Sequence, residues 1–466
     1  MNASADRRTL GLWGLGVGIA LLAFSPWPLW CVFPLLGAPG LLRGLSPWRG
    51  TLALTGLHAP LMVGAYATAL PLLPAGALGV GLVIVAPVLL HLLLACPLAW
   101  LLQGSPSPWR WALAAIALDQ LLMLPVLGLW GDPATPSIFM TAPMWLFGPG
   151  TGTLLFLLTG AALVQRSRWA LLPLALLGLA WGLKPSPATS SFLVAAAQGG
   201  DTRLREISDV PPGLALAEEA QWLPLIQNTG AVLVVLPENA TAVRQTRVQV
   251  KRPFPPNVLY GGISYTSLAA WNSVLADGRV LRSKRELVPL TERPWLTADQ
   301  NPLRPVQVAG HQLGVLICVE GLFAPAAARL ARQGAEILVV PASTKAFHAA
   351  RFQEIAARAA ASSAGLPLVL ASEAGGSVIV DTQGHTLSRA AWAQRQVIRA
   401  QISLGAPTFY AWTAPAWPFI LLLFALVQIR QHLSGRKRLR GVPEAKAAGD
   451  GARSRFQAGP PERPSP

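Results

Sequence analysis

The sequence is poor in charged residues. Only 12% of its 466 residues are Asp, Glu, Lys or Arg, about half of the roughly 25% that is usual in soluble domains. Hydrophobic residues make up 52% of the chain, and the mean hydropathy is +0.45. This composition excludes both a disordered chain and a single soluble globule.

Cysteine is also scarce, with only Cys31, Cys96 and Cys318 in the whole chain. Their number and spacing exclude a disulfide framework and a cysteine-based metal site. Cys31 and Cys96 lie inside apolar runs, where a thiol serves as a small hydrophobic side chain. We therefore expect no metal and no cofactor, and only Cys318 is a candidate for chemistry.

Acidic residues are fewer than basic ones, 21 against 37, which gives a net charge of +16. One basic cluster lies between Arg430 and Arg440, and the other basic residues occupy short loops between apolar runs. No basic stripe is interleaved with aromatic residues, as nucleic-acid binding would require. The basic residues therefore indicate membrane topology, and we expect no nucleic-acid partner.

Long apolar runs dominate residues 1–185, which are almost uncharged, whereas residues 186–410 have the composition of a soluble domain. A membrane-spanning helix needs about 20 apolar residues. The runs lie at about 9–25, 27–42, 51–73, 77–101, 110–130, 140–164 and 168–184, with an eighth at about 413–430. They predict a multi-span α-helical membrane domain of about eight helices, seven of them in residues 1–185 and one at 413–430.

The loop charges predict which ends of these helices face the cytoplasm. Positively charged residues favour the cytoplasmic side, and they alternate with uncharged or acidic loops along the chain. The basic positions are Arg7, Arg8, Arg43, Arg49, Arg110, Arg166 and Arg168. This alternation predicts a multi-pass protein of the bacterial inner membrane with cytoplasmic N- and C-termini and a periplasmic globular domain. The tail at 431–466 is basic and is predicted to be disordered. Any role of the apolar-run residues His58, His91 and Asp119 stays open.

The globular part alternates strand-like and helical patterns. Apolar strand-like runs are Phe192–Ala197, Ala231–Leu236, Leu313–Cys318, Ile337–Val340 and Leu366–Leu370. Helical spacing occurs at Leu214–Ile226 and Phe352–Ser362, and Gly365 is placed to end the second helix. Asp277-Gly278 and Gln383-Gly384 mark two hairpin turns. This order predicts an α/β sandwich with a mixed sheet.

Three segments at strand ends carry the candidate chemistry. They contain Glu238 after LVVLP, Lys284 with Glu292 eight residues later, and Cys318 with Glu320 two residues later. A strand-to-helix junction at Cys318 is expected to lower the thiol pKa and to offer backbone N–H groups to an oxyanion. A carboxylate could take the thiol proton, and a lysine could bind the oxyanion. Together the three groups would form an acyl-transfer site.

Each signal has a structural alternative. A single cysteine that closes an apolar strand is usually buried packing, Pro-Glu after a strand is usually a loop, and a lysine in a charged loop is usually solvated. Only the order and context of Glu238, Lys284 and Cys318 favour a functional reading over these alternatives.

That order resembles the nitrilase superfamily of carbon–nitrogen hydrolases over about residues 190–405. The resemblance lies in Pro237-Glu238-Asn239-Ala240, in Asn272-Ser273 with Lys284, Val288-Pro289 and Glu292, and in Ile317-Cys318-Val319-Glu320. It implies an αββα nitrilase-like sandwich with a catalytic triad of Glu238, Lys284 and Cys318. It also implies that Glu292 and Glu320 support the lysine and nucleophile segments.

A nitrilase-like domain placed between seven spans and one more resembles the apolipoprotein N-acyltransferase family. This resemblance implies that an acyl chain passes from a phospholipid donor through a Cys318 thioester to the N-terminal amine of a diacylglyceryl-cysteine lipoprotein. Glu238 would be the general base, and Lys284 would bind the oxyanion. The partners would be the phospholipid, the lipoprotein and the membrane, and the protein is expected to be a monomer.

Some recognition segments depart from that family. Val319 stands where the family has Tyr, residues 341–347 replace an Asn-Asp-aromatic segment, and the 358–362 segment lacks the family's glutamate. Two alternatives therefore remain open. One is a nitrilase-type membrane amidase or a conjugal-transfer-associated protein with another substrate, and the other is a non-catalytic scaffold.

Overall fold

The computed structural model divides the chain into two compact units, Met1–Trp417 and Pro418–Pro466. The residues that it describes are 3–23, 33–67, 81–102, 107–122, 144–182, 190–200, 221–241, 245–246, 254–288, 292–293, 295–344, 347–416, 419, 423, 427 and 430. In the second unit, Phe419, Leu423, Val427 and Arg430 are helical. Most of the predicted helix at 413–430 and the whole predicted tail at 431–466 lie outside the described residues.

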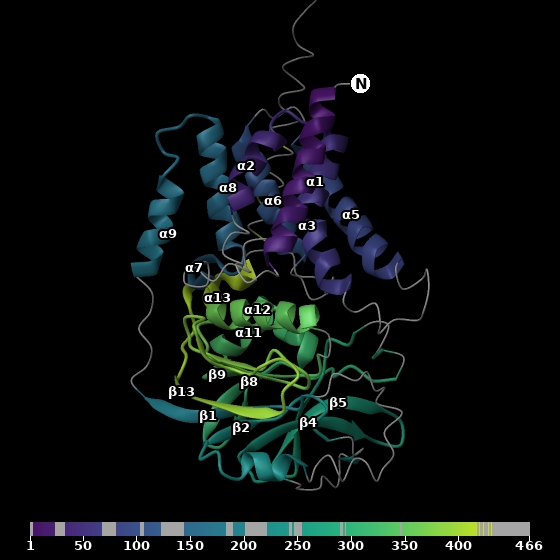
Figure 1. The fold of residues 1–466 in the computed structure, drawn as a ribbon, viewed down its shortest axis with the longest axis vertical. Helices are drawn as coiled ribbons and strands as arrows, with labels where there is room; N and C mark the ends of the chain where they lie inside the picture. Colours follow the sequence, from purple (N-terminus) through teal and green to yellow (C-terminus); the bar gives the residue numbers. More distant parts are fainter. Residues whose placement is uncertain are drawn as a thin grey trace, which may run out of the picture. The chain divides into compact units, whose positions relative to one another are not determined.

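The N-terminal part of the first unit is helical (Figure 1). Its elements are α1 (Ala3–Ala23), α2 (Phe33–Leu42), α3 (Pro47–Ala67), the π-helix η3 (Gly81–Val85), α5 (Ala86–Leu101), α6 (Pro108–Leu122), α7 (Met144–Phe147), α8 (Thr151–Val164) and α9 (Leu172–Gly182). Every predicted apolar run contains helix. The run at 140–164 was predicted as one helix, but it forms α7 and α8, because the chain turns at Gly148 with φ +84°.

Small residues bring these helices into close contact. A Cβ on Gly16 of α1 would lie 1.9 Å from the carbonyl oxygen of Gly56 in α3, and a Cβ on Gly160 of α8 would lie 2.3 Å from that of Leu36 in α2. The backbones therefore touch, as small residues allow. His58 on α3 and His91 on α5 are buried, with ring centroids 6.4 Å apart.

None of the described helices is both long enough and apolar enough to cross a membrane. Several are shorter than the roughly 20 residues that a crossing needs: α2 has 10 residues, α8 has 14 and α9 has 11.

Residues 190–416 form two stacked sheets. The strands are β1 (Ser191–Gln198), β2 (Leu233–Val235), β3 (Gln245–Thr246), β4 (Val258–Tyr265), β5 (Ala270–Ala276), β6 (Arg279–Ser283), β7 (Val306–Val308), β8 (His311–Val315), β9 (Ile337–Ala342), β10 (Leu368–Ser372), β11 (Val378–Val380), β12 (Thr386–Arg389) and β13 (Gln396–Ser403). The first sheet has the order β13-β1-β2-β4-β5-β6 with β3 beside β4, and the second has the order β12-β11-β10-β9-β8-β7.

Helices cover the outer faces of both sheets, which confirms the predicted αββα sandwich. One apolar core lies between the sheets and includes Val235 of β2 and Val339 of β9. A second packs α11 (Ala324–Arg332) and α12 (Phe347–Ala364) against the second sheet (Figure 1). A third packs the helical residues 221–226 against the first sheet through Trp222 and Ile226. The remaining elements are η6 (Cys318–Leu322), α13 (Phe409–Thr413) and η7 (Ala414–Ala416).

Local sequence signals place the turns correctly. Asp277 and Gly278 both have positive φ, +47° and +67°, and join β5 to β6, as expected for a two-residue hairpin turn. Gln383-Gly384 lies in the turn between β11 and β12. Gly365 has φ +81° and follows the last residue of α12. The strand predicted to end at Cys318 ends at Val315 instead, because Cys318 begins the 3₁₀ turn η6.

The strand directions bring four segments to one edge of the sandwich. Strand β2 runs parallel to β4, and β6 runs the same way because β4, β5 and β6 are successive antiparallel neighbours. In the second sheet β8 and β9 are parallel. The backbone N–H of Glu238, after β2, donates to the carbonyl of Ala342 at the end of β9, at 3.3 Å. The two sheets therefore meet at this edge.

Candidate active site

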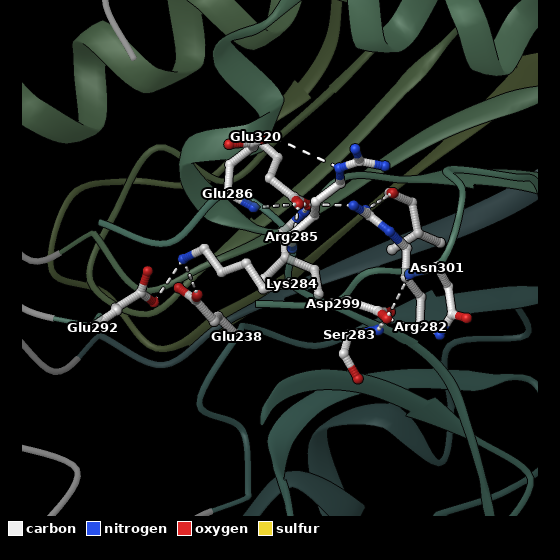
Figure 2. A network of polar contacts seen from close by, with 12 residues as sticks. Glu238, Arg282, Ser283, Lys284, Arg285, Glu286, Glu292, Asp299, Asn301 and Glu320 are labelled. Atoms are coloured by element: carbon white, nitrogen blue, oxygen red, sulfur yellow. Dashed lines mark hydrogen bonds and ion pairs between the residues drawn. The ribbon is translucent and has the colours of Figure 1, made fainter. Parts of the chain in front are cut away.

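Lys284 lies at the centre of a buried polar network (Figure 2). Its Nζ donates to Oε1 of Glu238 at 2.9 Å and to Oε1 of Glu292 at 2.7 Å. Its backbone is held on both sides, because its N–H donates to the Asn272 carbonyl at 2.7 Å and its carbonyl accepts from the Asp299 N–H at 2.9 Å. The lysine is therefore fixed between two carboxylates at the end of β6.

Asn272 on β5 completes this arrangement. Its Nδ2 donates to Oε1 of Glu238 at 2.6 Å and to Oε1 of Glu292 at 3.2 Å. The Asn272 amide and the Lys284 ammonium thus each donate to both carboxylates. The N–H of Val288 donates to the other oxygen of Glu292, Oε2, at 2.8 Å. The sequence analysis placed Asn272 in the lysine segment but gave it no role. Its position beside Lys284 across the hairpin could have indicated one.

The charges in this network control one another. Burial raises the pKa of Glu238, but the charge and hydrogen bond of Lys284 outweigh burial and hold that pKa below its ordinary value. Burial lowers the pKa of Lys284, but the charge of Glu238, together with the charge and hydrogen bond of Glu292, opposes burial and keeps that pKa above its ordinary value. At neutral pH both partners are therefore charged, although both side chains are buried.

Cys318 is half-buried and begins η6 with φ +52°. A non-glycine residue adopts this left-handed conformation at a cost of roughly 1–3 kcal/mol, and such residues often occur at functional sites. The turn is packed closely, since a Cβ on Gly321 would lie 2.8 Å from Cγ1 of Val340 on β9. The surrounding packing therefore holds the strained turn in place.

The resting thiol is protonated. Burial and the charge of Glu238 raise the pKa of Cys318 to about 12, and the charge of Lys284 opposes them only in part. The lowered thiol pKa predicted from the sequence is therefore wrong. The reason is that η6 is a short 3₁₀ turn whose dipole is weaker than the effects of burial and of the neighbouring carboxylate. The cysteine consequently needs a base before it can act as a nucleophile.

Glu238 has a free acceptor for that proton. Its Oε2 is buried and accepts no ordinary hydrogen bond from the residues that the structure describes. The side chains of Ser343 and Cys318 lie close enough to lower the pKa of Glu238 further, after the larger effect of Lys284. The free oxygen therefore belongs to a carboxylate that is ionised and lies beside the thiol.

Glu320 acts on the backbone on either side of the site. Its Oε2 accepts the N–H of Ile317 at 2.8 Å, and its Oε1 accepts the N–H of Arg285 at 2.8 Å and that of Glu286 at 3.2 Å. Arg282 forms an ion pair with the same Oε1 at 2.7 Å. Glu320 thus joins the nucleophile turn to the lysine segment, and the sequence analysis missed Arg282 and Ser343.

The structure therefore brings Glu238, Lys284, Glu292 and Cys318 together, with Glu320 behind the backbone that carries them. No group of three or more metal-binding side chains occurs in the described part of the chain. The arrangement holds a thiol, an ionised carboxylate with a free oxygen and a fixed ammonium group. These are the parts that acyl transfer through a covalent intermediate requires.

Part of the chain matches a known protein family. Residues 264–410 match the carbon–nitrogen hydrolase family, a range that includes Lys284 and Cys318. The chain contains a carbon–nitrogen hydrolase domain. No curated protein matches this chain.

Solved structures of the same class align with about half of the chain. A carbon–nitrogen hydrolase from Helicobacter pylori is 17% identical, with 46% of this chain and 90% of that chain covered and a TM-score of 0.36. Nit3 of Saccharomyces cerevisiae is 18% identical, with 47% of this chain and 93% of Nit3 covered and a TM-score of 0.36. An amidase from Nesterenkonia sp. with an acetamide group bound to its active-site cysteine is 18% identical, with 49% and 96% covered and a TM-score of 0.38.

The raised pKa of Cys318 predicts how the thiol reacts with iodoacetamide. Only the thiolate is alkylated rapidly, so the rate at Cys318 should rise steadily from pH 7 to pH 10 without a plateau. A small free thiol should level off near its ordinary pKa of roughly 8.5. The measurement is the alkylation rate by mass spectrometry in a chain with Cys31 and Cys96 replaced by Ser. A plateau below pH 9 at Cys318 would contradict the raised pKa of about 12.

Replacement of Lys284 by Met should leave Glu238 and Glu292 buried without a counter-charge. We expect turnover to fall by roughly 10²–10³-fold because an oxyanion donor is lost. We also expect the free energy of unfolding to fall by about 3–5 kcal/mol because a buried charge pair is broken. Steady-state kinetics and denaturant unfolding measure the two effects. Arg279→Met is the control, because Arg279 is on β6 just before Lys284 and its side chain is 71% exposed. It should change neither the turnover nor the free energy of unfolding.

Proposed function

We propose that this protein is a membrane acyltransferase that moves an acyl chain from a phospholipid to the N-terminal amine of a lipoprotein. The observation that carries the proposal is the buried carboxylate of Glu238 beside the protonated thiol of Cys318, with Lys284 fixed at 2.9 Å from the same carboxylate. This arrangement supports a thioester intermediate.

In the first half-reaction Sγ of Cys318 attacks the ester carbonyl, and Glu238 takes the thiol proton. The Nζ of Lys284 stabilises the negative charge that develops on the carbonyl oxygen. The carbon–oxygen bond then breaks, Glu238 returns its proton to the departing alkoxide, and a lysophospholipid leaves. The acyl group remains on Cys318 as a thioester.

In the second half-reaction the amine of the diacylglyceryl-cysteine attacks the thioester. Glu238 takes a proton from the amine as the carbon–nitrogen bond forms, and Lys284 again stabilises the oxyanion. The carbon–sulfur bond then breaks, the proton returns to the Cys318 sulfur, and the amide product leaves. Glu292 and Asn272 keep Lys284 and Glu238 in place through both steps.

The proposal places the helical part in the bacterial inner membrane and the hydrolase domain on its periplasmic side. The support is the alternation of basic and non-basic loops along residues 1–185 and the apolar composition of that half. Two lipid-linked substrates call for a site at a membrane surface. Fusion of a reporter enzyme that is active only in the periplasm to the chain after Gln198, the last residue of β1, tests the orientation.

The decisive experiment expresses the chain in cells depleted of their own lipoprotein N-acyltransferase. We expect restored growth and triacylated lipoprotein, detected by mass spectrometry of its N-terminal peptide. If diacylated lipoprotein accumulates although the protein is present in the membrane, the acceptor is not a lipoprotein.

An amidase that transfers the acyl group to water is the second candidate. The observation that favours it is the match of residues 264–410 to the carbon–nitrogen hydrolase family. Incubation with simple amides separates the candidates, because an amidase would release ammonia without any lipid present.

A further inference from the structure

The side chain of Arg282 crosses from one sheet of the sandwich to the other. Arg282 is on β6 of the first sheet, two residues before Lys284, and its side chain is only 9% exposed. Its Nη1 donates to the carbonyl of Val315, the last residue of β8 in the second sheet. Its Nη2 donates to Oε1 of Glu320 in η6 at 2.7 Å. One planar guanidinium thus contacts both the end of β8 and the turn η6; Arg282 and Glu320 are labelled in Figure 2.

These two points lie on either side of the nucleophile. Val315 is three residues before Cys318, and Glu320 is two residues after it. Glu320 in turn accepts the N–H of Ile317 at 2.8 Å and that of Arg285 at 2.8 Å. The segment before Cys318, the turn that follows it and the segment after Lys284 are therefore all bonded to one or the other member of this ion pair.

Stability alone is a poor explanation for the pair. A buried ion pair is often no more stabilising than apolar side chains of the same volume, because both charges lose their hydration. Apolar side chains cannot provide hydrogen-bond donors that point in fixed directions. A guanidinium holds its donors in a rigid fork, whereas an ammonium cannot contact both acceptors in the same geometry.

We propose that Arg282 is a positioning residue whose ion pair with Glu320 sets the distance between the Cys318 sulfur and the Lys284 ammonium. This inference rests on the proposed acyl transfer, in which the sulfur bonds to a carbonyl carbon while Lys284 binds the oxygen of the same carbonyl. A shift of about 1 Å between the two groups can cost 10²-fold in rate. The segments come from different sheets, so their separation depends on contacts between the sheets.

The test uses two reactions of Cys318 that need no natural substrate. Acylation by p-nitrophenyl acetate forms an oxyanion and needs Lys284, whereas alkylation by iodoacetamide forms none and needs only the thiol. In Arg282→Lys, which keeps the charge, we expect acylation to slow by about 10–10²-fold and alkylation to stay within threefold. Arg279→Lys, on the same strand with a 71% exposed side chain, should match the wild type in both reactions.

A second variant separates position from charge. Arg282→Met combined with Glu320→Gln removes both charges of the pair and leaves neither partner as an unpaired buried charge, so we expect it to keep the fold but lose the connection. We expect its acylation to stay at least tenfold slow while its thermal unfolding stays close to that of the wild type. Restored acylation in this double variant would show that charge balance matters and would overturn the inference. So would a wild-type acylation rate in Arg282→Lys, or an equal loss of acylation and alkylation.

The outcome is independent of the lipid substrates. If the chain fails to acylate lipoproteins but Arg282→Lys selectively slows acylation by p-nitrophenyl acetate, the proposed acceptor is wrong and the positioning role stands. If lipoprotein acylation is confirmed and Arg282→Lys is as fast as the wild type in both reactions, the positioning role alone is wrong.

Discussion

Replacement of Cys318 by Ala is expected to abolish acyl transfer. The Cys318 sulfur lies beside the carboxylate of Glu238, and without that sulfur no thioester can form. Loss of a covalent nucleophile commonly lowers turnover by about 10⁴-fold or more. Intact-mass spectrometry after incubation with phospholipid should show one added acyl group on the wild-type protein and none on the variant.

The same variant should keep its fold. An alanine adopts φ +52° at about the same conformational cost as a cysteine, because both have a Cβ. In addition, the Cys318 side chain is only half-buried. Cys96→Ser, which changes an exposed thiol in the helical part, is the matched control and should retain the adduct. An acyl group still attached to the Cys318→Ala protein, or turnover above background, would reject the covalent mechanism.

The architecture of the hydrolase domain could be predicted because its signals are local. Asp277-Gly278 supplies the two positive φ angles of a tight hairpin, and Gly365 supplies the left-handed residue that ends α12. Apolar runs between such turns can only be buried strands or helices. The division of residues 140–164 into α7 and α8 was missed because hydropathy alone does not reveal a turn within an apolar run.

The site could be predicted only in part. Glu238, Lys284 and Cys318 were found because each follows a strand in an order that resembles a known family. Arg282 looks in the sequence like any basic residue on an exposed hairpin strand, and only the stacking of the two sheets brings it to Glu320. The pKa of Cys318 was predicted in the wrong direction because its value depends on burial and on the distance to Glu238, and neither can be read from the sequence.

Replacement of Glu238 by Gln separates two effects that have opposite signs. The amide oxygen of Gln can still accept the hydrogen bonds of Lys284 and Asn272 at Oε1, so the geometry is kept. The variant has no base to accept the thiol or amine proton, and general-base catalysis contributes roughly 10²–10⁴-fold. We therefore expect acyl transfer to fall by about 10³-fold, measured as turnover with a phospholipid donor.

The reactivity of the thiol should change the other way. After burial, the charge of Glu238 is the largest contribution that raises the pKa of Cys318, and the charge of Lys284 is the one that lowers it most. Without the Glu238 carboxylate, burial and the charge of Glu292 still raise the pKa of Cys318, but one of the two carboxylates that oppose Lys284 is gone. Alkylation by iodoacetamide at pH 9 should therefore become faster. Glu336→Gln, a carboxylate outside the site that binds the N–H of Gln312, is the control and should change neither rate. A Glu238→Gln protein that transfers acyl groups at the normal rate would show that another group is the base. If the Glu238→Gln protein were alkylated more slowly, by the same factor as its turnover fell, Glu238 would hold the thiol in place rather than take its proton.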